Sequence, residues 1–163
     1  MQALETFRED MQCEAERLLA FAKAEEEIQV AVSERRWEAL ETLILKLRKQ
    51  SELVNEAEDR RFNSFALLKA ELGLPANIGF LRLLPMIPED KRQSLSESYR
   101  QLKVAVYAVK AATLRLNYYF QSVSETLQKI LQELLPHRKG KLYAPNGKTA
   151  EPLVDNLIVN HSL

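Results

Sequence analysis

The 163-residue sequence is poor in the residues that catalytic and metal sites use most often. It has one cysteine, Cys13, and two histidines, His137 and His161. A lone cysteine cannot form an internal disulfide, which suits a reducing compartment, and two histidines are too few for a histidine-based zinc site without other ligands. The four glycines form no glycine-rich loop of the kind that holds nucleotide phosphates. The sequence therefore predicts neither a metal nor a cofactor.

The sequence also lacks net charge and long apolar runs. Twenty-three basic residues balance twenty-three acidic ones, so the chain has no overall attraction to the phosphates of a nucleic acid. Glu5, Glu9 and Asp10 stand where a signal peptide would be basic and then apolar, and no apolar run approaches the ~18 residues of a spanning helix. We expect a cytoplasmic protein that neither binds nucleic acid nor inserts into membranes.

Apolar residues recur in alternating steps of three and four over three long segments, and we call each such row a seam. This spacing is typical of amphipathic helices with coiled-coil-like packing. It predicts helices at about 3–32, 36–72 and 89–135, joined by a connector over 73–88. The predicted fold is all-α, an antiparallel bundle of three long helices over 1–135, followed by a flexible C-terminal tail over 136–163.

Charged residues interrupt the first two seams. Glu14 and Glu25 occupy apolar positions of the first, and Glu58 and Arg61 do so in the second. Glu58 and Arg61 are three residues apart, so they can pair on one helix face or form a solvated patch. The sequence does not choose between these two arrangements.

The two junctions between the predicted helices differ. The apolar spacing loses its phase after Val32 and resumes at Trp37, and Ser33 is the expected N-cap of the second helix. Neither proline nor glycine marks this turn, so both a hairpin and a kink stay open. The connector 73–88 is apolar despite its prolines, and we expect a short helix near Phe80 to Leu84. Its side chains should cover one end of the bundle, namely Ile78, Phe80, Leu81, Leu84 and Ile87.

The third predicted helix is the longest. At 1.5 Å per residue it would span roughly 70 Å against ~45 Å for the first, so part of its seam should extend past the other helices. An uncovered apolar row in water favours a partner, either a helix of another protein or a second copy of this chain. The residues expected to bind it are Phe120, Val123, Leu127, Ile130 and Leu134.

Catalytic patterns are weak throughout the sequence. The serines of the third helix have no histidine near them in sequence, which argues against a hydrolytic triad. Arginines could hold an anionic substrate between helices, but among them only Arg61 lies on a seam. We expect no enzymatic activity, and a small helical enzyme is the least favoured alternative.

Three short motifs add a resemblance. The connector begins Leu72-Gly73-Leu74-Pro75, the third helix contains Leu116-Asn117, and the tail contains Leu142-Tyr143-Ala144-Pro145-Asn146-Gly147. With the order of helices, these motifs resemble FlgN-type flagellar export chaperones. The chain departs from the family pattern at Tyr119 and Phe120, where a second asparagine is common, and in a more apolar tail.

The resemblance implies a cytoplasmic chaperone for flagellar type III export. Such a protein binds the helical ends of hook-filament junction proteins, prevents their premature association and delivers them to the cytoplasmic domain of the export gate. It implies that Leu142 joins the client-binding row and that Tyr143 docks on the gate. Further tail contacts are expected from Asn146, Gly147, Leu157 and Ile158. The main alternative is a self-associating coiled-coil scaffold, in which the client-free protein forms homo-oligomers.

Overall fold

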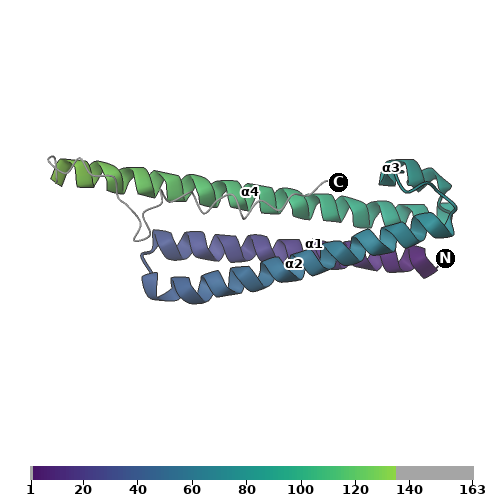
Figure 1. Cartoon of the computed structure of the whole chain (residues 1–163), viewed down its shortest axis with the longest axis horizontal. Helices are drawn as coiled ribbons and strands as arrows, with labels where there is room; N and C mark the ends of the chain where they lie inside the picture. Colours follow the sequence, from purple (N-terminus) through teal and green to yellow (C-terminus); the bar gives the residue numbers. More distant parts are fainter. Residues whose placement is uncertain (1, 135–163) are drawn as a thin grey trace. The chain divides into compact units, whose positions relative to one another are not determined.

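The computed structural model describes residues 2–134, and within that range every regular element is helical (Figure 1). The predicted all-α class and the three long helices are confirmed, with helix ends within a residue or two of those expected. The elements are α1 (Gln2–Ser33), α2 (Trp37–Glu71), the short α3 (Phe80–Leu83), the 3-10 turn η1 (Leu84–Met86) and α4 (Glu89–Leu134). The predicted tail over 136–163 lies outside the described residues.

The chain divides into two compact units, residues 1–116 and 117–163. In the first unit α1 and α2 lie side by side (Figure 1). They run antiparallel, because contacts progress from Phe7 with Phe65 near one end to Glu27 with Lys46 near the other. The part of α4 up to Leu116 joins this hairpin. Within the second unit the structure describes 117–134, the last stretch of α4.

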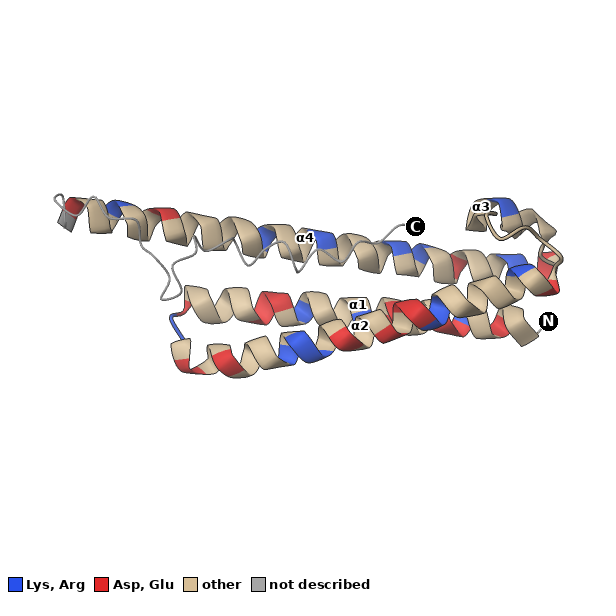
Figure 2. Cartoon of the chain, in the orientation of Figure 1, with Lys and Arg blue, Asp and Glu red and all other residues tan. Residues whose placement is uncertain are grey.

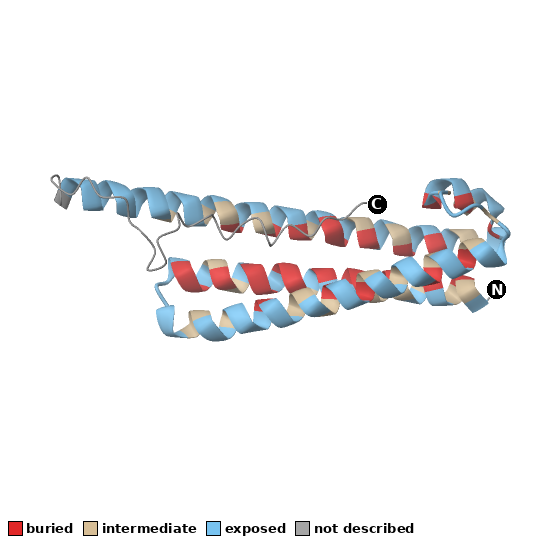
Figure 3. Ribbon diagram, viewed as in Figure 1, coloured by how far each residue is buried: buried red, intermediate tan, exposed pale blue. Residues whose placement is uncertain are grey.

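The core of the first unit is built from the seams that the sequence predicts. On α1 the apolar seam residues from Leu4 to Val32 are buried, and so is the α4 seam at Leu95, Leu102 and Leu116. Burial follows the helical period because only one face of each helix meets its neighbours. Figure 3 shows these buried positions facing the inside of the unit. The α2 seam is buried less completely, since Trp37 and Ile44 near its start are exposed.

The junction after α1 is a hairpin, which settles the alternative that the sequence left open. The Arg35 N–H donates to the Val32 carbonyl at 3.1 Å and the Arg36 N–H donates to the Ala31 carbonyl at 2.8 Å. This is a Schellman cap with Arg35 at φ 57, the left-handed position that glycine usually occupies. The prediction for Ser33 is wrong: it ends α1, and its hydroxyl donates to the Val30 carbonyl.

The connector packs on one end of the first unit, as expected, but not with every expected residue. Phe80 stacks on Tyr99 of α4 at 4.0 Å between ring centroids and lies 6.2 Å from the Phe7 ring. Leu83 is fully buried, whereas Leu81 is exposed, so the prediction for Leu81 is wrong. The short helix continues from α3 into η1. Its helical period places Leu83 on the buried face with Phe80, whereas Leu81 lies on the exposed face.

Candidate functional site

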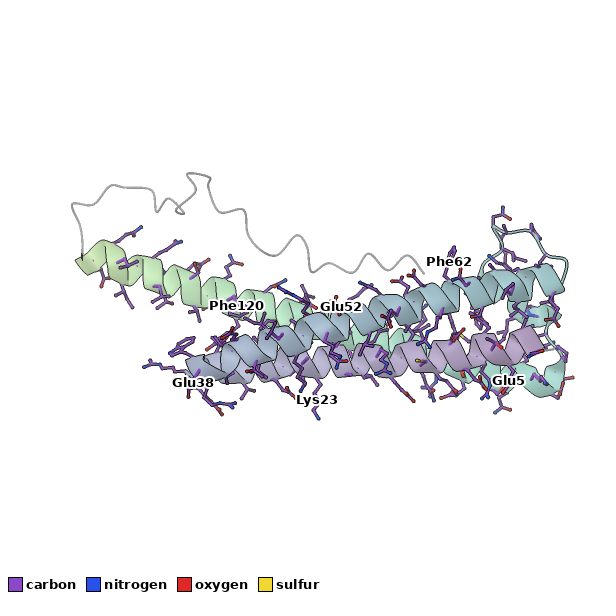
Figure 4. The ribbon with its side chains drawn as sticks, turned by 60° about the horizontal axis from the view of Figure 1, so that its bottom comes forward. Glu5, Lys23, Glu38, Glu52, Phe62 and Phe120 are labelled. Carbon is purple, nitrogen blue, oxygen red and sulfur yellow. The ribbon has the colours of Figure 1, made fainter. Side chains whose placement is uncertain are left out.

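The predicted client-binding row lies on the part of α4 that belongs to the second unit. Its large apolar side chains are substantially exposed: Phe120 (labelled in Figure 4) by 43%, Leu127 by 55% and Ile130 by 45%. Val123 is half-buried, and Leu131 beside the row is exposed by 45%. Figure 3 shows mostly exposed residues along this stretch. Four neighbouring apolar side chains in contact with water form a surface that another helix can cover.

The exposed row keeps the register of the buried α4 seam. The steps of four and three that run through Leu102 and Leu116 continue to Phe120 and Ile130 without a break. In the first unit this register marks the side of the helix that packs in the core. The same sequence pattern therefore has two outcomes on one helix, burial up to Leu116 and mainly exposure after it. We call Phe120, Val123, Leu127 and Ile130 the C-terminal stripe; Val123 is half-buried and the other three are exposed.

Of the remaining predicted site residues, one lies at the end of α4 and six follow it in the sequence. Leu134 is the last residue of α4. The predicted tail residues lie outside the described residues: Leu142, Tyr143, Asn146, Gly147, Leu157 and Ile158. Their roles stay predictions.

The arginine on the α2 seam is held by carboxylates inside the first unit. Arg61 donates from Nε to the buried Glu14 carboxylate of α1, and its Nη2 lies 4.0 Å from Oε1 of Glu58. Next to this pair, Arg60 Nη2 lies 3.3 Å from the sulfur of Cys13. The sequence marked Glu14 and Arg61 as separate interruptions, and the fold brings them together across the hairpin. Arg61 therefore meets protein carboxylates in the position where a helical enzyme would hold an anionic substrate.

Glu25 is the other charged residue of the α1 seam, and it is also buried. Its Oε1 accepts a hydrogen bond from the Thr113 hydroxyl at 2.8 Å, while its Oε2 is buried without a hydrogen-bond partner among the described residues. Burial raises the pKa of Glu25 from 4.5 to about 7, against the smaller lowering effects of Thr113 and Arg115. Arg115 itself donates to the neighbouring Glu26 at 2.8 Å. Glu25 thus changes charge near neutral pH inside the core.

No group of three potential metal-ligating side chains occurs among residues 2–134. A shallow depression lies between the start of α1 and the end of α2, and Glu71 is the ionisable residue in its lining, beside Thr6 and Ser64. None of the helices described between residues 2 and 134 is long and apolar enough to span a bilayer. The most developed surface feature of the described chain is therefore apolar and helical.

Comparisons of the chain with protein-family models, with curated proteins and with solved structures find no match.

Proposed function

We propose that this protein is an export chaperone of the FlgN type, which binds a helical end of a flagellar hook-filament junction protein. The observation that supports this most directly is the C-terminal stripe, an exposed apolar row in helical register on α4. The connector and tail motifs add the family resemblance. In the cell such a protein would act in the cytoplasm and deliver its client to the export gate.

Client binding follows from the physics of the stripe. A client helix that places its own apolar face on Phe120, Leu127 and Ile130 removes both surfaces from water. Full burial of such a side chain contributes about 1.5–3 kcal/mol, and each of these side chains is already about half covered. Each should therefore contribute about 1 kcal/mol to binding. The client's face, once covered, is unavailable for premature assembly.

The tail would supply the second half of the function. Leu142 would extend the client-binding row, and Tyr143 would dock on the cytoplasmic domain of the export gate. An aromatic side chain is well suited to a small, transient contact because it buries a large area with few rotatable bonds. No cofactor or nucleotide is needed for either step.

The first test is the light-scattering mass of the protein alone and mixed with the C-terminal helical region of a hook-filament junction protein from the same cell. A stoichiometric complex is expected. If no complex forms and the mass of the protein alone rises with concentration, the stripe serves self-association, and the scaffold replaces the chaperone.

The second test maps the site with alanine variants. Leu127→Ala should weaken client affinity about fivefold, and the triple change of Phe120, Leu127 and Ile130 about 100-fold. The matched control is Tyr118→Ala, because Tyr118 is an exposed aromatic on the opposite face of the same stretch of α4. Because all four substituted side chains are exposed, these variants should keep the helicity of the wild type. Equal loss of affinity in Tyr118→Ala would overturn the assignment of the site to this face.

A further inference from the structure

The first unit carries a second apolar row on α4, and neither the core nor the proposed client site uses it. Val104, Tyr107 and Leu114 are exposed by 56%, 63% and 69%, and Ala111 between them is exposed as well. Their spacing is three, four and three residues, so at about 100° per residue they lie within an arc of about 80°. The centre of this arc is opposite the buried seam of Leu102 and Leu116. We call these four residues the outer stripe.

The width of the outer stripe indicates the shape of its partner. A row confined to positions three and four apart is the narrow pattern of a helix–helix seam, whereas a helix that lies on a membrane needs a broader apolar face. In heptad terms Val104 and Ala111 occupy one core position, and Tyr107 and Leu114 the other. The alternation of large and small side chains offers holes into which the knobs of a second helix fit.

The charges beside the outer stripe indicate the chemistry of its partner. The flanking heptad positions hold Lys103 and Lys110 on one side and Arg115 on the other. Arg115 already pairs with Glu26, while the ammonium groups of Lys103 and Lys110 lie over the rings of Tyr99 and Tyr107, at 5.4 and 5.8 Å from their centroids. Lys103 and Lys110 therefore have no carboxylate partner among the described residues.

The basic character extends along this part of α4. Between residues 91 and 124 the sequence has six basic residues and a single acidic one, Glu97, although the whole chain is neutral. Arg100 uses that one carboxylate, with donor–acceptor distances of 3.0 and 2.7 Å. Figure 2 shows several basic bands along the middle of α4, with acidic bands towards its two ends. A second copy of α4 would bring basic residues against basic residues in either orientation, which opposes self-pairing through this face.

We propose that the outer stripe docks an amphipathic helix of another protein whose flanking heptad positions carry aspartate or glutamate. The apolar row supplies the buried seam, and Lys103 and Lys110 form ion pairs along one edge of it. This interaction uses different residues from the proposed client site, which lies in the second unit.

The test uses the full chain and a synthetic helical peptide of about four heptads, with leucine at both core positions and glutamate at both flanking positions. A second peptide differs only in having lysine at the flanking positions. The protein carries alanine at Phe120, Leu127 and Ile130, which weakens the C-terminal stripe. Binding is measured by fluorescence anisotropy of the labelled peptides. The acidic peptide should bind with one-to-one stoichiometry, at least about tenfold more tightly than the basic one.

Two variants identify the surface. Leu114→Gln and the charge reversal Lys103→Glu with Lys110→Glu should each weaken binding of the acidic peptide at least about tenfold. The control reversal, Lys23→Glu with Lys49→Glu, changes the net charge equally at exposed positions of α1 and α2 and should have little effect. The Lys23 side chain points away from the helical hairpin (Figure 4). Circular dichroism checks that every variant keeps its helicity.

Four results would overturn the proposal. The first is equal binding of the two peptides, and the second is peptide binding that Leu114→Gln leaves unchanged. The third is a concentration-dependent dimer that Leu114→Gln abolishes, because that assigns the outer stripe to a second copy. The fourth is co-sedimentation with vesicles of phosphatidylglycerol and phosphatidylcholine that Leu114→Gln abolishes while neither peptide binds. That result assigns the stripe to an anionic membrane.

Discussion

Replacement of Glu25 by glutamine should remove most of the pH dependence of stability between pH 5 and pH 8. Glu25 is buried in the first unit with one carboxylate oxygen bonded to Thr113 and the other without a hydrogen-bond partner among the described residues. Its pKa is raised from 4.5 to about 7 by burial. Glutamine keeps the shape of the side chain and accepts the Thr113 hydrogen bond but cannot ionise.

The sign and size of this pH dependence follow from the pKa of Glu25 in the unfolded chain, 4.5, and in the folded protein, about 7. Between pH 4.5 and 7 the folded protein holds a proton that the unfolded chain has released, so raising the pH favours unfolding. The contribution of protonated Glu25 to the free energy of unfolding is fully present at low pH and is lost as the pH rises through 7. The whole shift corresponds to about 3 kcal/mol, and the part between pH 5 and pH 8 is about 2.5 kcal/mol. The Glu25→Gln variant should gain that much stability relative to the wild type over this interval.

The measurement is urea denaturation followed by circular dichroism at pH 5, 6, 7 and 8 for both proteins. Glu26→Gln is the matched control, because Glu26 is the next residue but is exposed and paired with Arg115. The difference in free energy of unfolding between Glu25→Gln and the wild type should grow towards pH 8. The corresponding difference for Glu26→Gln should not. If the difference between Glu25→Gln and the wild type is the same at pH 5 and pH 8, the carboxyl is not desolvated and the reasoning fails.

Three further predictions concern the connector, the helix caps and the tail. Leu83→Ala should lower the free energy of unfolding by about 2–5 kcal/mol in urea denaturation, and equal loss in the exposed Leu81→Ala would contradict the observed packing. Gly73 at φ 64 and Arg35 at φ 57 occupy the same left-handed cap position, so Gly73→Ala should cost about 1 kcal/mol and Arg35→Gly should gain about 0.5 kcal/mol. Changes of the same sign would refute this account of the caps. Tyr143→Ala should preserve helicity and client binding while weakening pull-down by the export gate domain, and loss of helicity would instead make Tyr143 structural.

The helices could be predicted because their signals are local. A seam with steps of three and four, Gly73 before Pro75, and Pro88 before Glu89 each act within a few residues, and α1, α2 and α4 begin and end close to the predicted positions. The hairpin cap was harder to foresee. Its left-handed residue is Arg35, so the sequence carried neither the glycine nor the asparagine that usually signals this conformation.

The exposed apolar row after Leu116 could also be predicted from spacing, and its role in client binding stays a prediction, whereas the outer stripe was missed. Val104, Tyr107 and Leu114 have the same three-four spacing as any seam, but the longer and more apolar seam on the opposite face of α4 dominated the pattern. Counting apolar residues on both faces of α4, with the sign of the charges beside them, would have found it. The tail residues, Tyr143 among them, keep the roles that the family resemblance assigns to them as predictions.

By itself the sequence determined that this protein is helical, where its long helices lie and which face of each is apolar, because a period of three and four residues acts within one helix. The tertiary structure decided which side chains contact the charged residues that interrupt the seams. The reversal at Arg35 sets the register of α2 on α1, and that register places Arg61 on Glu14. The packing of α4 on α1 likewise places Thr113 on Glu25. Such contacts join residues far apart in the chain, so their energies depend on a geometry that no local pattern contains.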